Sequence, residues 1–326
     1  MNRRLNQAVT IGLFLTLSMM HSQPATAESK LVKTTVAYRE VHGHDILADV
    51  YRPEGDVVRG VIVWIHGGGL IMGHREGIHP QVRATAEEQG YALVSIDYRL
   101  APETKLPELI SDIEAAFHWL AGDGATQFHL DPSRIVVCGA SAGGYLTLVT
   151  GYRARPQPKA LVALYGYGNL IGDWYSTPSP HPRHNPKKIT REEAAKQTDG
   201  TIISDARQRK GNGGMIYLYY RQNGIWPQEV SGFDRATIAE KIAPFEPVRN
   251  VTAAYPPTLL IHGVVDTDVP YEESTMMAEQ LEQHGVPFFV APIETGEHGL
   301  GGGDPRQIEA AYKTMREFIV KHLTAH

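Results

Sequence analysis

The sequence predicts an α/β fold whose core is a doubly wound, mostly parallel sheet. Short runs that are apolar at every position recur along the chain, as at residues 61–65 and 135–138. Strands of this kind are buried on both faces, which is typical of parallel sheets. Longer segments with helical spacing of apolar residues lie between these runs. Such alternation implies right-handed crossovers that place helices on both faces of the sheet.

The individual elements follow from the same two periodicities. Residues 46–51 alternate as a half-buried strand, and the remaining strands are continuous apolar runs. The expected strands are residues 46–51, 61–65, 91–96, 135–138, 160–165, 258–261 and 287–291. The expected helices are residues 107–121, 145–151, 271–284 and 305–322.

The first residues predict a secretory signal peptide. Arg3 and Arg4 precede an apolar run at residues 8–20, and Pro-Ala-Thr-Ala at 24–27 is a small-x-small cleavage signal. The alternative is an uncleaved membrane anchor, but the run is shorter than the roughly 20 residues that span a bilayer. We expect cleavage after Ala27, a secreted or periplasmic protein without a stable membrane anchor, and a single domain over residues 28–326.

The composition excludes several other classes of protein. Hydrophobic residues make up 42% of the 326 residues, and charged residues of both signs make up 21%, so a packed core is expected. The formal net charge is -5 and no Lys/Arg block stands out, so we expect no nucleic-acid partner. Cys138 is the single cysteine and lies in an apolar run, where we expect a buried side chain rather than a reactive thiol.

One region departs from the alternation of strands and helices. Residues 168–233 contain no clear strand–helix unit and are rich in Pro, Gly, Tyr and Trp, including Trp174 and Trp226. A long irregular segment inside a compact domain usually forms a lid or a binding loop. His181 and His184 raise the alternative of a metal site here, but no third ligand with suitable spacing accompanies them. We therefore expect an insert that shapes a pocket, and no metal.

The strongest chemical signal is Gly-Ala-Ser-Ala-Gly at residues 139–143. It follows the strand at 135–138 and precedes a helix, which is the strand–turn–helix context of the G-x-S-x-G motif. A sharp turn there exposes the Ser141 hydroxyl at the sheet edge and at a helix N-terminus. By itself the motif is of moderate specificity, since small residues also occur in plain strand–helix turns.

A glycine run provides the second signal. His66-Gly67-Gly68-Gly69 follows the strand at 61–65, and glycines leave their backbone N–H groups open to approach. Acyl transfer needs such donors where an oxyanion develops. We expect Gly68, Gly69 and the N–H of Ala142 to form this oxyanion hole. A phosphate cradle is the alternative, but the following lysine or the glycine spacing that it requires is absent.

A nucleophilic serine needs a base, and the base needs an orienting acid, in the chain order Ser, Asp/Glu, His for this arrangement. Asp266 follows the strand at 258–261, and His298 follows the strand at 287–291, so both lie at the same sheet edge as Ser141. Asp268 is the alternative acid, although it is also placed to cap the helix that follows. His284 is a less favoured base, and His262 is expected to be structural.

Three motifs together carry a family resemblance. His66-Gly67-Gly68-Gly69, Asp-Tyr-Arg-Leu-Ala-Pro-Glu at 97–103 and Gly-Ala-Ser-Ala-Gly-Gly at 139–144 resemble the hormone-sensitive-lipase-like and acetyl-esterase-like carboxylic ester hydrolases of the α/β-hydrolase superfamily. His-Gly-x-x-Asp at 262–266 followed by Val269-Pro270 resembles the acid loop of prolyl-oligopeptidase-like hydrolases. The resemblance implies the triad Ser141, Asp266 and His298 and no cofactor. It also implies that residues 97–103 pack structurally against the active-site wall.

The sequence departs from the family pattern at two places. Ala140 stands where relatives often have aspartate, and the short segment before His66 leaves no room for the N-terminal helical cap that relatives often carry. The insert at 168–233 must then shape the pocket. We expect a carboxylesterase-type serine hydrolase that acts on small or short-acyl esters, with acetylated or feruloylated sugars among the candidate substrates. The alternatives are a prolyl-oligopeptidase-like peptidase and a non-catalytic binding protein on a hydrolase scaffold.

Overall fold

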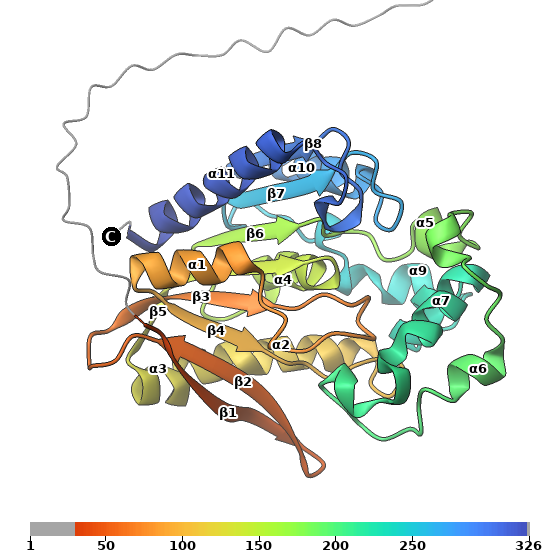
Figure 1. Ribbon diagram of the computed structural model, residues 1–326, viewed down its shortest axis with the longest axis horizontal. Coiled ribbons are helices and arrows are strands. Elements are labelled where there is room, and N and C mark those ends of the chain that lie inside the picture. Colours follow the sequence, from red (N-terminus) through yellow and green to blue (C-terminus); the bar gives the residue numbers. More distant parts are fainter. Residues whose placement is uncertain (1–29, 325–326) are drawn as a thin grey trace, which may run out of the picture.

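The computed structural model of the protein describes residues 30–324, so the predicted signal peptide at residues 1–27 lies outside the described residues. Within the described range, the strands form one eight-stranded sheet in the order β1-β2-β4-β3-β5-β6-β7-β8 (Figure 1). The strands are β1 (Val32–Val41), β2 (His44–Arg52), β3 (Arg59–Ile65), β4 (Ala92–Ile96), β5 (Leu130–Ala140), β6 (Ala160–Leu164), β7 (Thr258–Gly263) and β8 (Phe288–Ile293).

The direction of the strands confirms the predicted fold class. Strands β3 to β8 pair in parallel, whereas β1 and β2 are added antiparallel at one edge. The carboxyl ends of parallel strands share one edge of a sheet, and ligands of open α/β sheets bind beside that edge. The loops that follow β3, β5, β7 and β8 therefore meet at one place.

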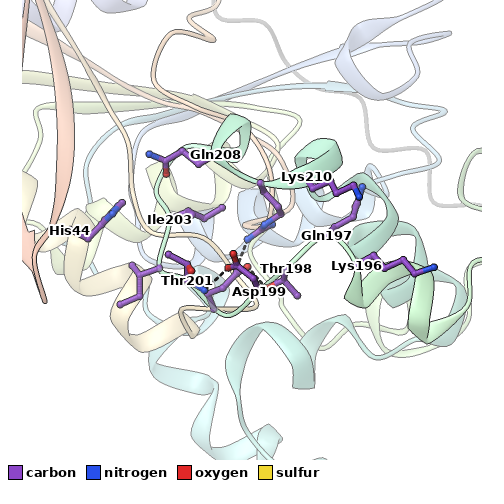
Figure 2. Close-up of a pocket in the computed structure, with 12 residues that line it drawn as sticks. His44, Lys196, Gln197, Thr198, Asp199, Thr201, Ile203, Gln208 and Lys210 are labelled. Atoms are coloured by element: carbon purple, nitrogen blue, oxygen red, sulfur yellow. Dashed lines mark hydrogen bonds and ion pairs between the residues drawn. The ribbon is translucent and has the colours of Figure 1, made fainter.

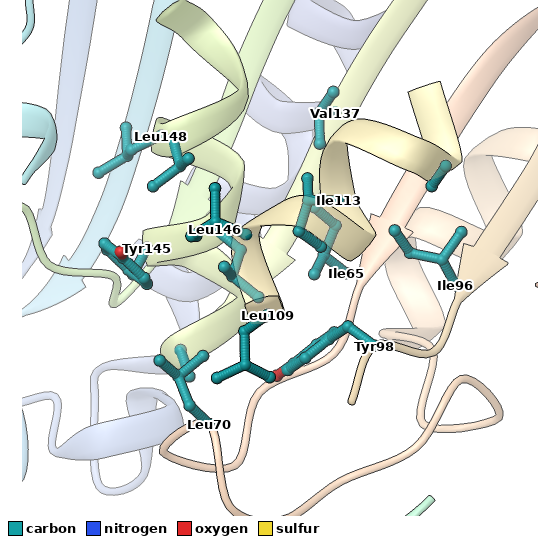
Figure 3. Packing of buried hydrophobic residues seen from close by; sticks show 14 of the residues in the cluster. Ile65, Leu70, Ile96, Tyr98, Leu109, Ile113, Val137, Tyr145, Leu146 and Leu148 are labelled. Atoms are coloured by element: carbon teal, nitrogen blue, oxygen red, sulfur yellow. The ribbon is translucent and has the colours of Figure 1, made fainter. Parts of the chain in front are cut away.

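Helices cover both faces of the sheet. The helices that pack on it are α1 (Pro80–Gln89), α2 (Leu106–Ala121), α3 (Asp123–Phe128), α4 (Ala142–Arg153), α10 (Glu272–Gln283) and α11 (Pro305–Thr324). Along β3, Val63 and Ile65 belong to the core shared with α2 and α4, whereas Ile62 and Trp64 belong to the core shared with α1 and α11. Figure 3 shows Ile65 among side chains of the first core. Burial on both faces explains why these strands are apolar at every position.

Two of the helices that pack on the sheet are not predicted by the apolar periodicity of the sequence. Helix α1 contains one large aliphatic residue, Val82, and buries Thr85 and Ala86 beside it, so its apolar stripe is weak. Helix α3 is only 6 residues long. Tertiary contacts rather than sequence pattern account for such elements. Among residues 30–324, no helix has both the length and the apolar character required to cross a membrane.

The chain leaves the sheet after β6 and returns to it at β7, and this excursion contains the expected insert. It holds the short helices α5 (Asp173–Ser176), α6 (Arg191–Ala195), α7 (Gly214–Asn223), α8 (Trp226–Ser231) and α9 (Ile238–Lys241). Because α9 follows Phe233, helical structure continues past residues 168–233. Figure 1 shows α5, α6 and α7 beyond the arrowheads of β3, β4, β6 and β7, at the end of the sheet where ligands bind.

Candidate active site

Ser141 sits in a strained turn between β5 and α4. Its φ is 54° and its ψ is -122°, a backbone conformation that is uncommon for a residue with a side chain. Close backbone contacts enforce the turn, because a Cβ on Gly139 would lie 2.2 Å from the Gly143 carbonyl oxygen. A Cβ on Gly143 would lie 2.0 Å from the carbonyl oxygen of Ile65. The glycines of the motif are therefore required for the turn that exposes Ser141.

The structure brings Ser141, His298 and Asp266 together in one hydrogen-bonded chain. The Nε2 atom of His298 lies 3.0 Å from Ser141 Oγ, and Nδ1 of His298 lies 2.7 Å from Asp266 Oδ2. Since a carboxylate can only accept, Nδ1 donates to it and Nε2 is left to accept the serine proton. This is the arrangement of an activated serine nucleophile.

Asp266 is fixed and charged. Its side chain is fully buried, and Oδ1 accepts hydrogen bonds from the backbone N–H groups of Asp268 at 2.8 Å and Val269 at 2.9 Å. Burial raises the pKa of Asp266, but hydrogen bonds to His262 and His298 outweigh it and hold this pKa at about 2. Asp266 is therefore ionised at neutral pH, as an orienting acid must be.

The alternative residues His262, His284 and Asp268 do not take the place of the base or the acid. His262 is buried, with Nε2 3.3 Å from Asp266 Oδ2 and Nδ1 2.7 Å from Ser274 Oγ, so it supports the acid rather than the serine. His284 is exposed at the end of α10. Asp268 does not cap α10, whose N-terminus has no side-chain cap; its carboxylate instead contacts the insert.

The expected oxyanion-hole residues lie on the loop after β3 and at the start of α4. Gly68 and Gly69 have φ of 119° and 62°, so both positions favour glycine. The loop packs on the nucleophile turn, since a Cβ on Gly67 would lie 3.2 Å from Ser141 Cβ. Within residues 30–324, the N–H groups of Gly68 and Gly69 donate no hydrogen bond. Ala142 begins α4, where helical N–H groups lack partners within the helix.

One contact of the base is not predicted from the sequence. The ring of Tyr165, directly after β6, lies edge-on to the His298 imidazole with centroids 5.0 Å apart. The position of Tyr165 at the carboxyl end of a predicted strand is the only signal that indicates this contact. The Tyr165 ring packs against the His298 imidazole, which must present Nε2 to Ser141, and so restricts the orientation of the imidazole.

Residues 97–103 pack against the loop that follows β3 and carries the expected oxyanion-hole glycines. Asp97 accepts hydrogen bonds from the backbone N–H of Arg75 at 2.6 Å and from its Nη1 at 2.7 Å. The Tyr98 ring stacks on His66 at 4.4 Å, and Tyr98 Oη donates to the His66 carbonyl. Burial lowers the pKa of His66 to about 4, so this imidazole is neutral at pH 7. These contacts agree with the structural role that the resemblance implies for this segment.

The beginning of the insert is anchored by a buried carboxylate of α10. Glu273 Oε2 accepts hydrogen bonds from the N–H groups of Gly168 and Asn169, and Oε1 accepts one from Trp174 Nε1 at 2.8 Å. Trp174 stacks on Tyr175 with centroids 3.6 Å apart. The insert is thus fastened beside the acid loop.

Later parts of the insert contact the catalytic loops directly. Arg183 Nη1 lies 2.8 Å from Glu297, the residue before His298, and Trp226 Nε1 donates to the Gly69 carbonyl at 3.0 Å. Tyr217 packs against Gly69, since a Cβ there would lie 2.8 Å from its ring. The insert therefore forms a wall of the site around Ser141.

His184 belongs to this wall. Its Nδ1 lies 2.7 Å from Ser179 Oγ and its Nε2 lies 2.8 Å from Asp268 Oδ1, so both ring nitrogens have partners. Among the residues that the structure describes, no group of three or more His, Cys, Asp or Glu side chains is placed to hold a metal ion.

Two cavities adjoin these elements. A cavity of about 520 Å³ is lined mostly by residues of the insert, with His44, Lys196, Asp199 and Lys210 among its lining residues (Figure 2). No triad residue lines it. A small cavity of about 60 Å³, lined by both Asp266 and Asp268, lies between the acid loop and the insert.

Comparisons with known proteins identify relatives of the whole domain. The family model described as alpha/beta hydrolase fold matches residues 62–301. Carboxylesterase NlhH of Mycobacterium tuberculosis is 39% identical over 151 residues, which are 45% of this chain and 46% of the relative. Non-reducing polyketide synthase ausA of Aspergillus calidoustus is 25% identical over 376 residues, which cover 97% of this chain. The chain spans only 15% of the length of that synthase.

Solved structures share the fold. A truncated carbohydrate esterase from gut microbiota superposes with a TM-score of 0.64 at 19% identity, covering 93% of this chain and 100% of that chain. An acetyl ester-xyloside bifunctional hydrolase from Caldicellulosiruptor lactoaceticus has a TM-score of 0.62 at 20% identity, covering 88% of this chain and 96% of that chain. At 19% and 20% identity, these two structures show a shared fold and no more.

Proposed function

Because this chain belongs to the α/β-hydrolase fold family, we propose that it is a serine carboxylic ester hydrolase with the triad Ser141, His298 and Asp266. The observation that carries the proposal is the hydrogen-bonded chain from Asp266 through His298 to Ser141, with distances of 2.7 Å and 3.0 Å. A fold of this kind hosts many functions, so the geometry of the triad, and not the fold, supports this assignment.

The geometry supports an acyl-enzyme mechanism. His298 Nε2 takes the Ser141 proton as Oγ attacks the ester carbonyl, and Asp266 stabilises the imidazolium that forms. The N–H groups of Gly68, Gly69 and Ala142 stabilise the oxyanion of the tetrahedral intermediate. The alcohol leaves with the proton from Nε2, and water then attacks the acyl-enzyme by the same route.

We infer that the substrates are small or short-acyl esters, with acetylated or feruloylated sugars as candidates. The support is the insert, which closes over the site through Tyr217 on Gly69 and through the hydrogen bond from Trp226 to the Gly69 carbonyl. Two proteins of similar fold are described as a carbohydrate esterase and as an acetyl ester-xyloside bifunctional hydrolase, which agrees with this substrate class.

A panel of substrates tests this function. It comprises p-nitrophenyl esters from acetyl to long acyl chains, acetylated xylan, a feruloyl ester and a prolyl amide. We expect the highest kcat/KM for short acyl chains and negligible cleavage of the prolyl amide. Cleavage of the prolyl amide with little ester hydrolysis would instead support the peptidase, and no turnover of any substrate would support a non-catalytic binding protein.

We also propose that the protein is exported and that residues 1–27 are removed. The support is Arg3 and Arg4 before the apolar run at 8–20, followed by the small-x-small signal that ends at Ala27. N-terminal sequencing of the exported protein is expected to begin at Glu28. A mature chain that still begins at Met1 would contradict this proposal.

A further inference from the structure

Asp268 is a second carboxylate beside the base, and the insert holds it in place. Its Oδ1 accepts hydrogen bonds from three side chains of the insert: His184 Nε2 at 2.8 Å, Tyr217 Oη at 2.5 Å and Arg221 Nη1 at 3.1 Å. The Arg221 guanidinium in turn lies 4.8 Å from the centre of the Tyr175 ring. One oxygen of Asp268 is therefore fully engaged, and the carboxylate cannot turn without breaking these bonds.

The other oxygen of Asp268 faces the catalytic pair. Within residues 30–324, Oδ2 accepts no hydrogen bond; it lies 3.7 Å from His298 Nε2 and 4.0 Å from Arg183 Nη2. The side chain is 13% exposed, whereas that of Asp266 is fully buried. A rigid carboxylate oxygen with unused lone pairs thus lies next to the nitrogen that exchanges a proton with Ser141.

The position of Nε2 indicates which part of a substrate Asp268 meets. In the proposed mechanism Nε2 returns its proton to the oxygen of the leaving alcohol, so that oxygen must lie within hydrogen-bond reach of Nε2. The oxyanion donors hold the carbonyl oxygen, and Tyr217, which donates to Asp268, also packs on Gly69. Asp268 Oδ2, 3.7 Å from Nε2, therefore lies on the side of the site that the alcohol portion of a bound ester would occupy.

Building on the proposed function, we propose that Asp268 Oδ2 accepts a hydrogen bond from a hydroxyl on the carbon next to the esterified carbon. The preferred substrates are then monoesters of vicinal diols and polyols. Asp268 then contacts the substrate and determines specificity, whereas the triad breaks the ester bond.

The surrounding charges favour a neutral hydroxyl over an ammonium group. The buried Arg221 guanidinium is hydrogen-bonded to Asp268 and balances its negative charge. Arg183 lies 4.0 Å from Oδ2 and is itself paired with Glu297. Burial lowers the pKa of His184, more than its hydrogen bond to Asp268 raises it, so this imidazole adds no charge at neutral pH. A cationic substrate group would meet Arg183, whereas a hydroxyl needs only the free lone pair.

The wild-type enzyme provides the first test, with 2-hydroxyethyl acetate, 2-methoxyethyl acetate and ethyl acetate. The methoxy compound keeps the shape and the ether oxygen but cannot donate a hydrogen bond. We expect kcat/KM for the hydroxyethyl ester to exceed that for the methoxyethyl ester by about tenfold or more, the effect of one hydrogen bond to a charged group. Equal values would overturn the proposal and leave the esterase function standing. No turnover of these esters or of p-nitrophenyl acetate would overturn both.

The variant Asp268→Asn tests the residue. Three donors of the insert surround the Oδ1 position, so the amide oxygen takes that place and the NH₂ group replaces Oδ2. A donor then stands where the acceptor stood, and the ratio between hydroxyethyl and methoxyethyl esters is expected to fall to about one or below. Asp173→Asn, which removes an exposed carboxylate of the same insert, is expected to keep the wild-type ratio.

An Asp268→Asn enzyme that keeps the wild-type ratio would overturn the proposal, and so would one that loses all three activities equally while remaining folded by circular dichroism. If this variant does not fold, the wild-type comparison of the hydroxyethyl and methoxyethyl esters decides alone.

Discussion

Replacing Ser141 by alanine is expected to lower kcat for p-nitrophenyl acetate by about a million-fold, because the variant has no Oγ to form the acyl-enzyme. The turn itself should persist. It is enforced by the contacts of Gly139 and Gly143 with neighbouring backbone, and these do not involve the serine hydroxyl. Removing the nucleophile alone costs about as much as removing the whole triad, so the remaining His298 and Asp266 should not rescue turnover.

The measurement is the rate of p-nitrophenolate release by purified Ser141→Ala, compared with wild type at equal concentration. Circular dichroism and thermal unfolding provide the control for folding. Turnover within tenfold of wild type in pure, folded variant would show that another group attacks the ester.

Replacing Asp266 by asparagine is expected to lower kcat by about ten-thousand-fold. Asparagine matches the shape of aspartate, but its amide cannot stabilise the imidazolium, and it favours the tautomer that no longer accepts the serine proton at Nε2. Asp266 lies 2.7 Å from Nδ1, whereas Asp268 approaches the imidazole only at Nε2, at 3.7 Å. Asp268→Asn is therefore the control, because it makes the same substitution at the neighbouring carboxylate. If Asp268→Asn lost far more activity on p-nitrophenyl acetate than Asp266→Asn, Asp268 rather than Asp266 would be the orienting acid.

The same substitution changes the stability of the protein in acid. The pKa of Asp266 is held at about 2 in the folded chain, below the ordinary value of 3.8. Its charge therefore stabilises the fold above about pH 4, and this contribution disappears as the pH falls towards 2. The free energy of unfolding of Asp266→Asn should then decrease by about 2 kcal/mol less than that of wild type between pH 5 and pH 2. Guanidinium unfolding at several pH values measures this difference, and parallel curves would contradict it.

Much of the site follows from the sequence because its residues stand at the ends of recognisable strands. Ser141, Asp266 and His298 each follow an apolar run, and parallel strands bring their carboxyl ends to one edge. The glycine turn around Ser141 identifies the nucleophile because only small residues permit its close backbone contacts. These signals are local, so they can be read without the tertiary structure.

Local sequence signals do not decide which of Asp266 and Asp268 orients the base. Both carboxylates stand on one loop, two residues apart. The backbone folds back so that the N–H groups of Asp268 and Val269 hold Oδ1 of Asp266 and direct Oδ2 to the base. The partners of Asp268 come from His184, Tyr217 and Arg221, which are distant in the sequence and lie in a segment without regular periodicity. Their convergence depends on how the insert packs.

Covalent catalysis at Ser141 is tested directly by an active-site label. The full chain is treated with a fluorophosphonate, digested and mapped by mass spectrometry, with Ser141→Ala as the control. We expect one phosphonylated peptide, modified at Ser141, and no adduct in the variant. An adduct at any other residue, or none in folded wild-type protein, would contradict covalent catalysis at Ser141.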